Sequence, residues 1–198
     1  MEPIPETDDL SAFLAADDVL DHHDPVVVET AALLAEDADN LHEYAHTVYE
    51  YVRDMIPHSF DSGDPGVTWR ASDVLARRNG ICYAKSHALV ALLRARGIPA
   101  GLCYQRLTED DGSDPVLHGL AALRLPGADR WSRLDARGNK PGVDAAFSLD
   151  VERLAFPVRP ELGECDYPTV YAAPLPQVVD CLWAAPSSSQ IVLPTELP

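Results

Sequence analysis

The chain has 198 residues, which suits one folded domain, and 46% of them are hydrophobic while 24% are charged. The formal net charge of −17 argues against nucleic acid and anionic membrane as partners, because both also carry negative charge. The start MEPIPETDDL lacks the basic and apolar regions of a signal peptide, and no apolar run reaches the ~20 residues that a membrane span needs. We therefore expect a cytoplasmic protein, and its oligomeric state stays open.

The charged residues are unevenly distributed among their types. There are 21 aspartates against 11 glutamates, and 13 arginines against two lysines. A GC-rich genome would explain the preference for arginine, but only part of the aspartate surplus. We hypothesise a halophilic source, whose acidic surface repels itself at low ionic strength and is screened at high salt.

Helical signals dominate the first half of the chain. Asp24 as N-cap and Pro25 at the first helical position predict the start of one helix. A second helix is predicted over 40–56, where apolar residues recur at helical spacing. Ser72 is the expected cap of a short third helix that stops at Gly80.

The next helix is predicted to begin near Cys82 and to run to about Arg96, with Gly97 as its C-terminal glycine. After it the pattern changes to strands. Three are predicted, in the segments AGLCYQRL (100–107), VLHGLAALRL (116–125) and RWSRLDA (130–136). Helices followed by an antiparallel meander predict an α+β domain.

Both ends of the chain look different from its middle. Residues 1–9 form an acidic tail, and the domain is expected over 10–185. The chain after Arg137 is rich in proline and predicts only one short helix, in PQVVDCLWAA. Residues 186–198 are expected to form an extended C-terminal tail.

Four cysteines are present and none forms a CxxC pair, so free thiols in a reducing compartment are expected. Cys103 and Cys181 lie among apolar neighbours and are expected to pack, while the acidic surroundings of Cys165 disfavour a thiolate. Cys82 differs, because Gly80 permits a turn that places it in the first turn of a helix. Free N–H groups and the helix dipole favour a thiolate there. Nucleophile and packing residue both remain open for Cys82 on this argument alone.

A nucleophilic thiol needs a base, and the base needs a group that orients it. His118 lies in one predicted strand and Asp135 in the next. A hairpin loop of PG would place the two residues directly opposite each other, and a loop of PGAD would make them diagonal neighbours. Either even-length loop keeps both side chains on one face of the sheet. In the directly opposed arrangement the carboxylate and the imidazole would lie within hydrogen-bonding reach. An odd or bulged loop would break this pairing.

The remaining histidines carry weaker signals. His87 follows Cys82 by five residues, so the two side chains diverge around a helix. His58 has only an expected loop role. A metal site remains a minor alternative that would use four residues, His22, His23, His42 and His46.

Three blocks resemble the transglutaminase-like superfamily of papain-like cysteine enzymes. They are GICYAKSHALVALLRARGIPAGLCYQRL, then LHGLAAL, then RWSRLDARGNK, and together they lie within 73–140. The family pattern is a Gly-x-Cys helix start, a Gly-Ile-Pro step into a strand, a histidine strand and a Trp-x-x-x-Asp strand. The resemblance implies a helical layer with a central cysteine-bearing helix, packed on an antiparallel sheet.

The resemblance also implies roles: Cys82 as nucleophile, His118 as general base and acid, and Asp135 as the orienting carboxylate. Trp131 fits the pattern, whereas Leu120 stands where family members commonly have tryptophan, which puts the wall of the substrate channel in doubt. A side-chain donor to the oxyanion is not assigned by the pattern. Gln105 and Trp69 are the candidates.

The function expected from these residues is hydrolysis of an amide or peptide through a thioester on Cys82, with no metal or organic cofactor. Acyl transfer from the same thioester to an amine is the first alternative, and a catalytically silent binding module on this fold is the second. The segment DARGNK follows Asp135 directly and is expected to line the site.

Overall fold

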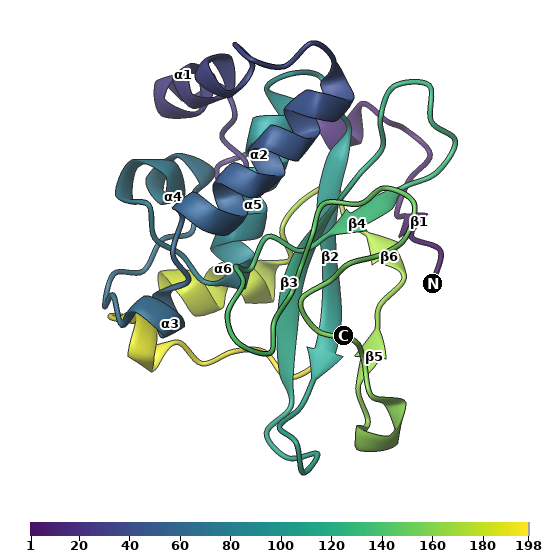
Figure 1. Ribbon diagram of the computed structural model, residues 1–198. Coiled ribbons are helices and arrows are strands. Elements are labelled where there is room, and N and C mark those ends of the chain that lie inside the picture. Colours follow the sequence, from purple (N-terminus) through teal and green to yellow (C-terminus); the bar gives the residue numbers. More distant parts are fainter. Residues whose placement is uncertain (198) are drawn as a thin grey trace.

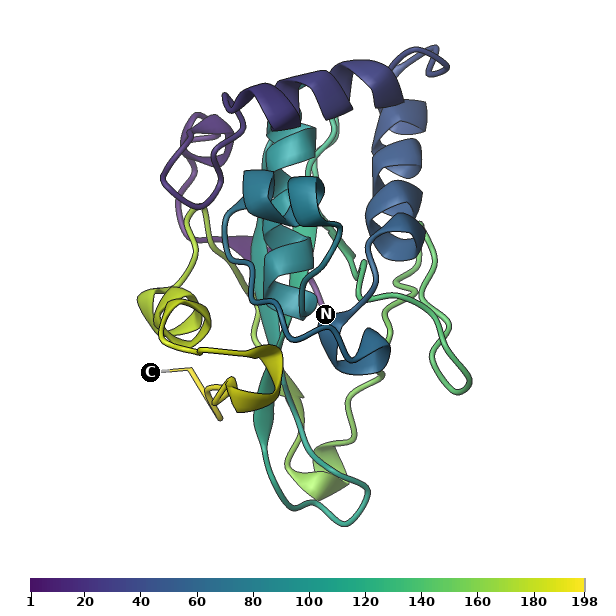
Figure 2. The same ribbon diagram turned by 90° about the vertical axis from the view of Figure 1, so that its left-hand side faces the viewer.

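The computed structural model describes residues 1–197, and its fold is α+β. The main sheet has four antiparallel strands in the order β4-β3-β2-β5. Helices gather on one side of this sheet, as Figures 1 and 2 show from two directions. The strands are β2 (Ala100–Leu107), β3 (Val116–Leu123), β4 (Ser132–Leu134) and β5 (Cys165–Asp166). The helices are α1 (Pro25–Leu34), α2 (Leu41–Met55), α3 (Ser59–Ser62), α4 (Ala71–Arg77), α5 (Cys82–Arg94) and α6 (Pro176–Trp183).

Helix α5 forms the centre of the protein, because all 13 of its residues are buried. It packs against β3 and β2 on one side and against α4, α2 and α1 on the other. Its sequence is rich in alanine and leucine, which favour helix, and Gly97 just beyond it has the left-handed φ of 72°. The expected central cysteine-bearing helix is thereby confirmed. Within residues 1–197 no helix has both the length and the apolarity to cross a lipid bilayer.

Of the first three helix starts predicted from the sequence, two agree with the structure. The Asp24 side chain accepts a hydrogen bond from Val26 N at the start of α1, as its position predicts, and α2 begins at Leu41. The prediction for Ser72 is wrong. Ser72 lies inside α4, and both its N–H and its hydroxyl donate to the Asp21 carboxylate, 51 positions earlier in the chain. Ser72 therefore donates its hydrogen bonds to a carboxylate that is distant in the sequence and does not act as a local helix cap.

The register of the β3–β4 pair selects one of the two hairpin alternatives. Ala121 lies opposite Leu134 and Leu123 opposite Ser132, which corresponds to the four-residue loop PGAD. Because this loop has an even length, His118 and Asp135 are diagonal neighbours on one face of the sheet.

Both terminal segments make more contacts than their composition predicted. Near the N-terminus, β1 (Ile4–Pro5) pairs in parallel with β6 (Thr169–Val170). Near the C-terminus, Ser188 N–H and hydroxyl donate to Pro65 O and Asp64 O, and Leu117 N–H of β3 donates to Pro194 O at 2.7 Å. Within 186–197, residues 188–190 form a short 3-10 helix, while Pro198 lies outside the described residues.

Candidate active site

The structure brings Cys82, His118 and Asp135 together from three different elements. Cys82 is the first residue of α5, His118 lies on β3, and Asp135 follows β4 directly. His118 Nε2 and Asp135 Oδ2 are 2.8 Å apart, which is hydrogen-bonding distance. The three residues are nearly buried, with exposed fractions of 7%, 5% and 1%.

Asp135 is held in its ionised form by several donors. Its two oxygens accept hydrogen bonds from Arg137 N–H at 3.1 Å and Ala155 N–H at 3.0 Å, in addition to His118. Burial alone would raise the pKa of this carboxyl, but the charge and hydrogen bond of His118 and the two N–H groups outweigh burial and lower it. The group therefore keeps a negative charge in the protein interior.

His118 takes up the opposite charge. Burial would lower the pKa of its imidazole, but the Asp135 carboxylate and the neighbouring Cys82 sulfur raise it well above the ordinary value. The Phe156 ring stands edge-on to the imidazole, with 5.2 Å between the ring centroids. An imidazolium between a carboxylate and a thiol is the arrangement that supports a thiolate.

Cys82 and His118 open into a cleft of about 670 Å³. Apolar side chains, among them Phe60, Phe156 and Leu193, contribute to its wall. Arg137 and Lys140 also line it, so the placement expected for the DARGNK segment is confirmed. Both of these cations pair with one carboxylate, that of Asp61.

His58 is a member of this site that the sequence did not predict. Its Nε2 accepts a hydrogen bond from the backbone N–H of Cys82 at 3.1 Å, and its side chain lines the same cleft. Burial, and then the charge of Arg137, lower the pKa of His58 to about 3, so the ring is neutral. The sequence separates the two residues by 24 positions without a recognisable pattern. A bridge between the backbones of His58 and Gly80 brings them together.

Neither candidate oxyanion donor lies at the cleft. The Gln105 amide donates to Asp166 Oδ1 at 2.9 Å and to Phe156 O at 3.3 Å. It thus links β2 to β5 and to the segment that carries Phe156, and it does not line the cleft. The Trp69 carbonyl accepts from His87 Nδ1, and its ring lies under the Arg70 guanidinium. Both residues therefore have other partners, and neither lines the cleft at Cys82.

Leu120 does not form a wall of the cleft. It is fully buried in a small apolar cluster with Phe13, Cys103 and Trp131. Leu120 shares a sheet face with His118, two residues earlier in β3, while Gly119 between them faces Tyr83 of α5 on the opposite face. Leu120 nevertheless packs into this cluster and does not line the cleft. Leucine in place of tryptophan at position 120 therefore affects the packing of this apolar cluster. The aromatic ring beside His118 is that of Phe156.

The remaining thiols differ from Cys82 in their surroundings. Burial raises the pKa of Cys103 and of Cys181 to about 12, which agrees with their expected packing roles. Cys165 is exposed. All four cysteines are free.

The histidines proposed for a metal do not converge. His42 and His46 both contact the Phe147 ring, and His22 lies against His23 with their ring centroids 4.1 Å apart. No group of three metal-binding side chains occurs among residues 1–197. The minor alternative of a four-histidine site is therefore wrong for these residues.

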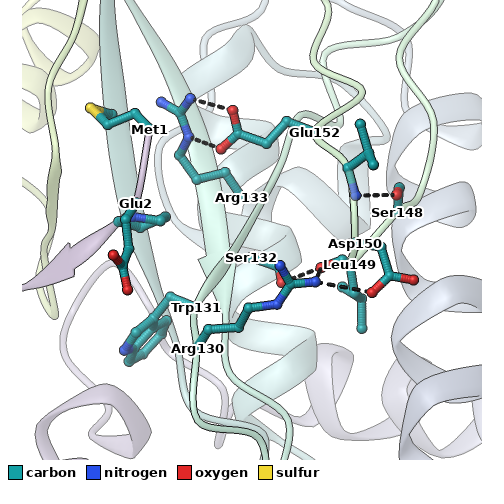
Figure 3. Close-up of a pocket in the computed structure, with 12 residues that line it drawn as sticks. Met1, Glu2, Arg130, Trp131, Ser132, Arg133, Ser148, Leu149, Asp150 and Glu152 are labelled. Carbon is teal, nitrogen blue, oxygen red and sulfur yellow. Dashed lines mark hydrogen bonds and ion pairs between the residues drawn. The ribbon is translucent and has the colours of Figure 1, made fainter.

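A second cleft lies beside β4, where the N-terminus approaches Trp131 (Figure 3). Four of its charged side chains already pair with one another, Arg133 with Glu152 at 2.6 Å and Arg130 with Asp150 at 3.0 Å. Its wall contains no cysteine or histidine. The cleft at Cys82 is therefore the candidate active site.

A buried thiol at a helix start, with histidine and aspartate on neighbouring strands of an antiparallel sheet, is typical of papain-like thiol enzymes. The family model of the transglutaminase-like superfamily matches residues 29–136, more than half of the chain. The chain belongs to this superfamily. No curated protein sequence matches the chain.

Solved structures match the chain at low identity. A candidate cysteine protease from Cytophaga hutchinsonii is 20% identical, with a TM-score of 0.53 over 69% of this chain and 45% of that protein. An arylamine N-acetyl transferase from M. smegmatis is 19% identical, with a TM-score of 0.44 over 66% and 51% of the two chains. A TGase is 16% identical, with a TM-score of 0.39 over 63% and 33%. The chain thus spans about half or less of the length of these three proteins.

Proposed function

We propose that the protein hydrolyses an amide or peptide bond through a thioester formed on Cys82, with His118 as general base and acid and Asp135 as the residue that orients the imidazole. The observation that carries this proposal is the 2.8 Å contact between the His118 imidazole and the buried Asp135 carboxylate, with Cys82 and His118 lining the same cleft. In the first turn of α5 the Cys82 N–H donates to His58, and the N–H groups that follow it can stabilise the negative charge that develops on the substrate oxygen.

The reaction has two halves. In the first, His118 already holds the proton given up by the Cys82 thiol, the sulfur bonds to the carbonyl carbon, and the carbon–nitrogen bond breaks as His118 passes that proton to the leaving amine. In the second, His118 takes a proton from water, the resulting hydroxyl bonds to the thioester carbon, and Cys82 leaves. Asp135 stabilises the imidazolium that is present between these steps.

Alkylation by iodoacetamide, followed against pH and located by mass spectrometry, tests the nucleophile. Cys82 should react at about pH 6, well below the ~8.5 typical of an ordinary thiol. Cys103, Cys165 and Cys181 serve as internal controls and should lag behind. His118→Ala should move the alkylation of Cys82 toward ordinary pH. Slow and uniform labelling of all four thiols would reject the enzyme and favour a silent binding module.

An amine acceptor can resolve the same thioester, so hydrolysis and acyl transfer must be separated by their products. A peptide-amide mixture would be incubated with the protein in the absence and presence of hydroxylamine, and the products analysed by mass spectrometry. Free acid as the main product without the amine supports hydrolysis. A product that forms only when the amine is present supports acyl transfer. The Cys82→Ala variant is the control and should give neither.

A further inference from the structure

We propose that His58 is a positioning residue, which caps the helix of the nucleophile with an uncharged acceptor and so fixes Cys82 without adding negative charge beside its sulfur. This inference rests on the proposed function of Cys82. It assigns a role to a residue that lies outside the Cys82, His118 and Asp135 set.

The helix that carries Cys82 lacks a cap of its own. Its N-cap residue is Ile81, which has no side-chain acceptor to offer. The first N–H groups of a helix have no partner inside the helix, and an external acceptor stabilises them. His58 supplies that acceptor, since its Nε2 lies 3.1 Å from Cys82 N.

The position of His58 is itself fixed from two sides. Lys85, one turn along α5, donates from Nζ to Ile56 O at 2.5 Å and to Arg53 O at 3.1 Å, at the end of α2. On the other side of His58, Ser59 N–H donates to Gly80 O at 3.2 Å. The segment that carries the imidazole is therefore tied to Lys85 of α5 before it and to Gly80, two residues ahead of α5, after it, which holds the ring against the start of the helix.

The choice of histidine has an electrostatic reason. Aspartate or serine is a common cap, and a carboxylate interacts best with the helix dipole. Next to a sulfur that must ionise, a carboxylate would oppose the thiolate. A neutral imidazole accepts the same hydrogen bond without this penalty. Because Nε2 accepts, the ring proton lies on Nδ1, which has no partner among the described residues.

Other charged groups also face this ring and must stay constant in a test. Asp61 of α3, Arg137 after β4, Lys85 of α5 and His118 of β3 all act on His58. Asp61 is paired with Arg137, so the two charges largely offset each other. None of these groups is altered by a substitution at His58 alone.

The test compares three variants of the full-length protein: His58→Asn, a neutral acceptor; His58→Asp, an acceptor with a negative charge; and His58→Leu, which offers no acceptor. The readout is the pH midpoint for alkylation of Cys82 by iodoacetamide. His58→Asn should keep a midpoint within about half a pH unit of wild type, whereas His58→Asp should raise it by one unit or more, the scale of a like charge at close range. His58→Leu should slow alkylation at pH 6 by about tenfold or more. His46→Asp, on the exposed face of α2, adds the same charge elsewhere and should leave the midpoint unchanged.

The comparison of asparagine with aspartate remains valid even where both variants lose stability, because the two side chains have nearly the same size. Equal midpoints for these two variants would overturn the inference, as would wild-type behaviour of His58→Leu. Failure of the proposed function gives a different result. In that case wild-type Cys82 would react no faster than Cys165 at any pH, and both proposals would fall.

Discussion

Gly119 offers a direct test of how β3 and α5 place the histidine beside the sulfur. A methyl group at this position would stand 2.5 Å from Cδ1 of the Tyr83 ring, 3.1 Å from Cε1 and 3.4 Å from Cα. Tyr83 is fully buried, and its hydroxyl donates to Leu117 O at 2.6 Å. The ring therefore has little room to move, and because Tyr83 follows Cys82 directly, its displacement would also move the sulfur.

The size of the effect follows from these distances. An ordinary carbon–carbon contact is about 3.5–4.0 Å, so Gly119→Ala requires about 1 Å of movement between β3 and the first turn of α5. Overpacking of this kind costs about 1–3 kcal/mol in the free energy of unfolding. A misplacement of about 1 Å between reacting groups can lower the rate about 100-fold. We expect both losses in Gly119→Ala.

Gly101→Ala is the matched control. Its methyl group would stand 2.6 Å from Tyr171 O and 2.7 Å from Val170 Cγ1, so it also overpacks the sheet, but away from Cys82. Urea unfolding should show a similar loss of stability for both variants. Alkylation of Cys82 at pH 6 should fall strongly only in Gly119→Ala. Equal alkylation rates in the two variants would refute the idea that the Gly119–Tyr83 contact sets the position of the sulfur.

Two further predictions concern stability. Burial lowers the pKa of His87 to about 4, while an unfolded histidine titrates near 6.5, so the unfolded state binds more protons between these values and the free energy of unfolding falls on acidification. His87 should contribute about 2 kcal/mol of the loss between pH 7 and pH 4.5 in urea unfolding, and His58, whose pKa is also lowered, adds to it. His87→Asn should therefore flatten this slope by about that amount, and an unchanged slope would contradict the assignment. The net charge of −17 predicts a higher Tm in about 2 M KCl than in about 0.05 M KCl, because salt screens repulsion between carboxylates. Equal Tm values in a scan at both salts would remove the halophile hypothesis.

Local patterns in the sequence predicted much of the site. The even-length hairpin loop was enough to place His118 and Asp135 on one face, and the register then selected the diagonal arrangement. The helix that starts at Cys82 follows from its alanine and leucine content and from the glycine after it. These features depend on neighbours within a few residues, which is why spacing reveals them.

Other features depend on contacts between distant segments. Ser72 was predicted as a cap, but Asp21 provides the acceptor. Gln105 was a candidate for the oxyanion site, but its side-chain amide donates a hydrogen bond to Asp166 of β5. Such partners are 51 and 61 positions away and leave no periodic trace in the sequence.

The amino-acid sequence by itself determined the order of α1, α2, α4, α5, β2, β3 and β4 and which thiol begins a helix, because hydrophobic period, glycine position and loop parity are local properties of the chain. The short elements α3, β1, β5 and β6 were not predicted. Only the tertiary structure decided that His58 accepts a hydrogen bond from the backbone N–H of Cys82 and that the Phe156 ring lies beside His118. Both contacts arise where separate segments pack against the same end of α5 and β3. Their geometry is set by the packing of the whole domain, which no short stretch of sequence encodes.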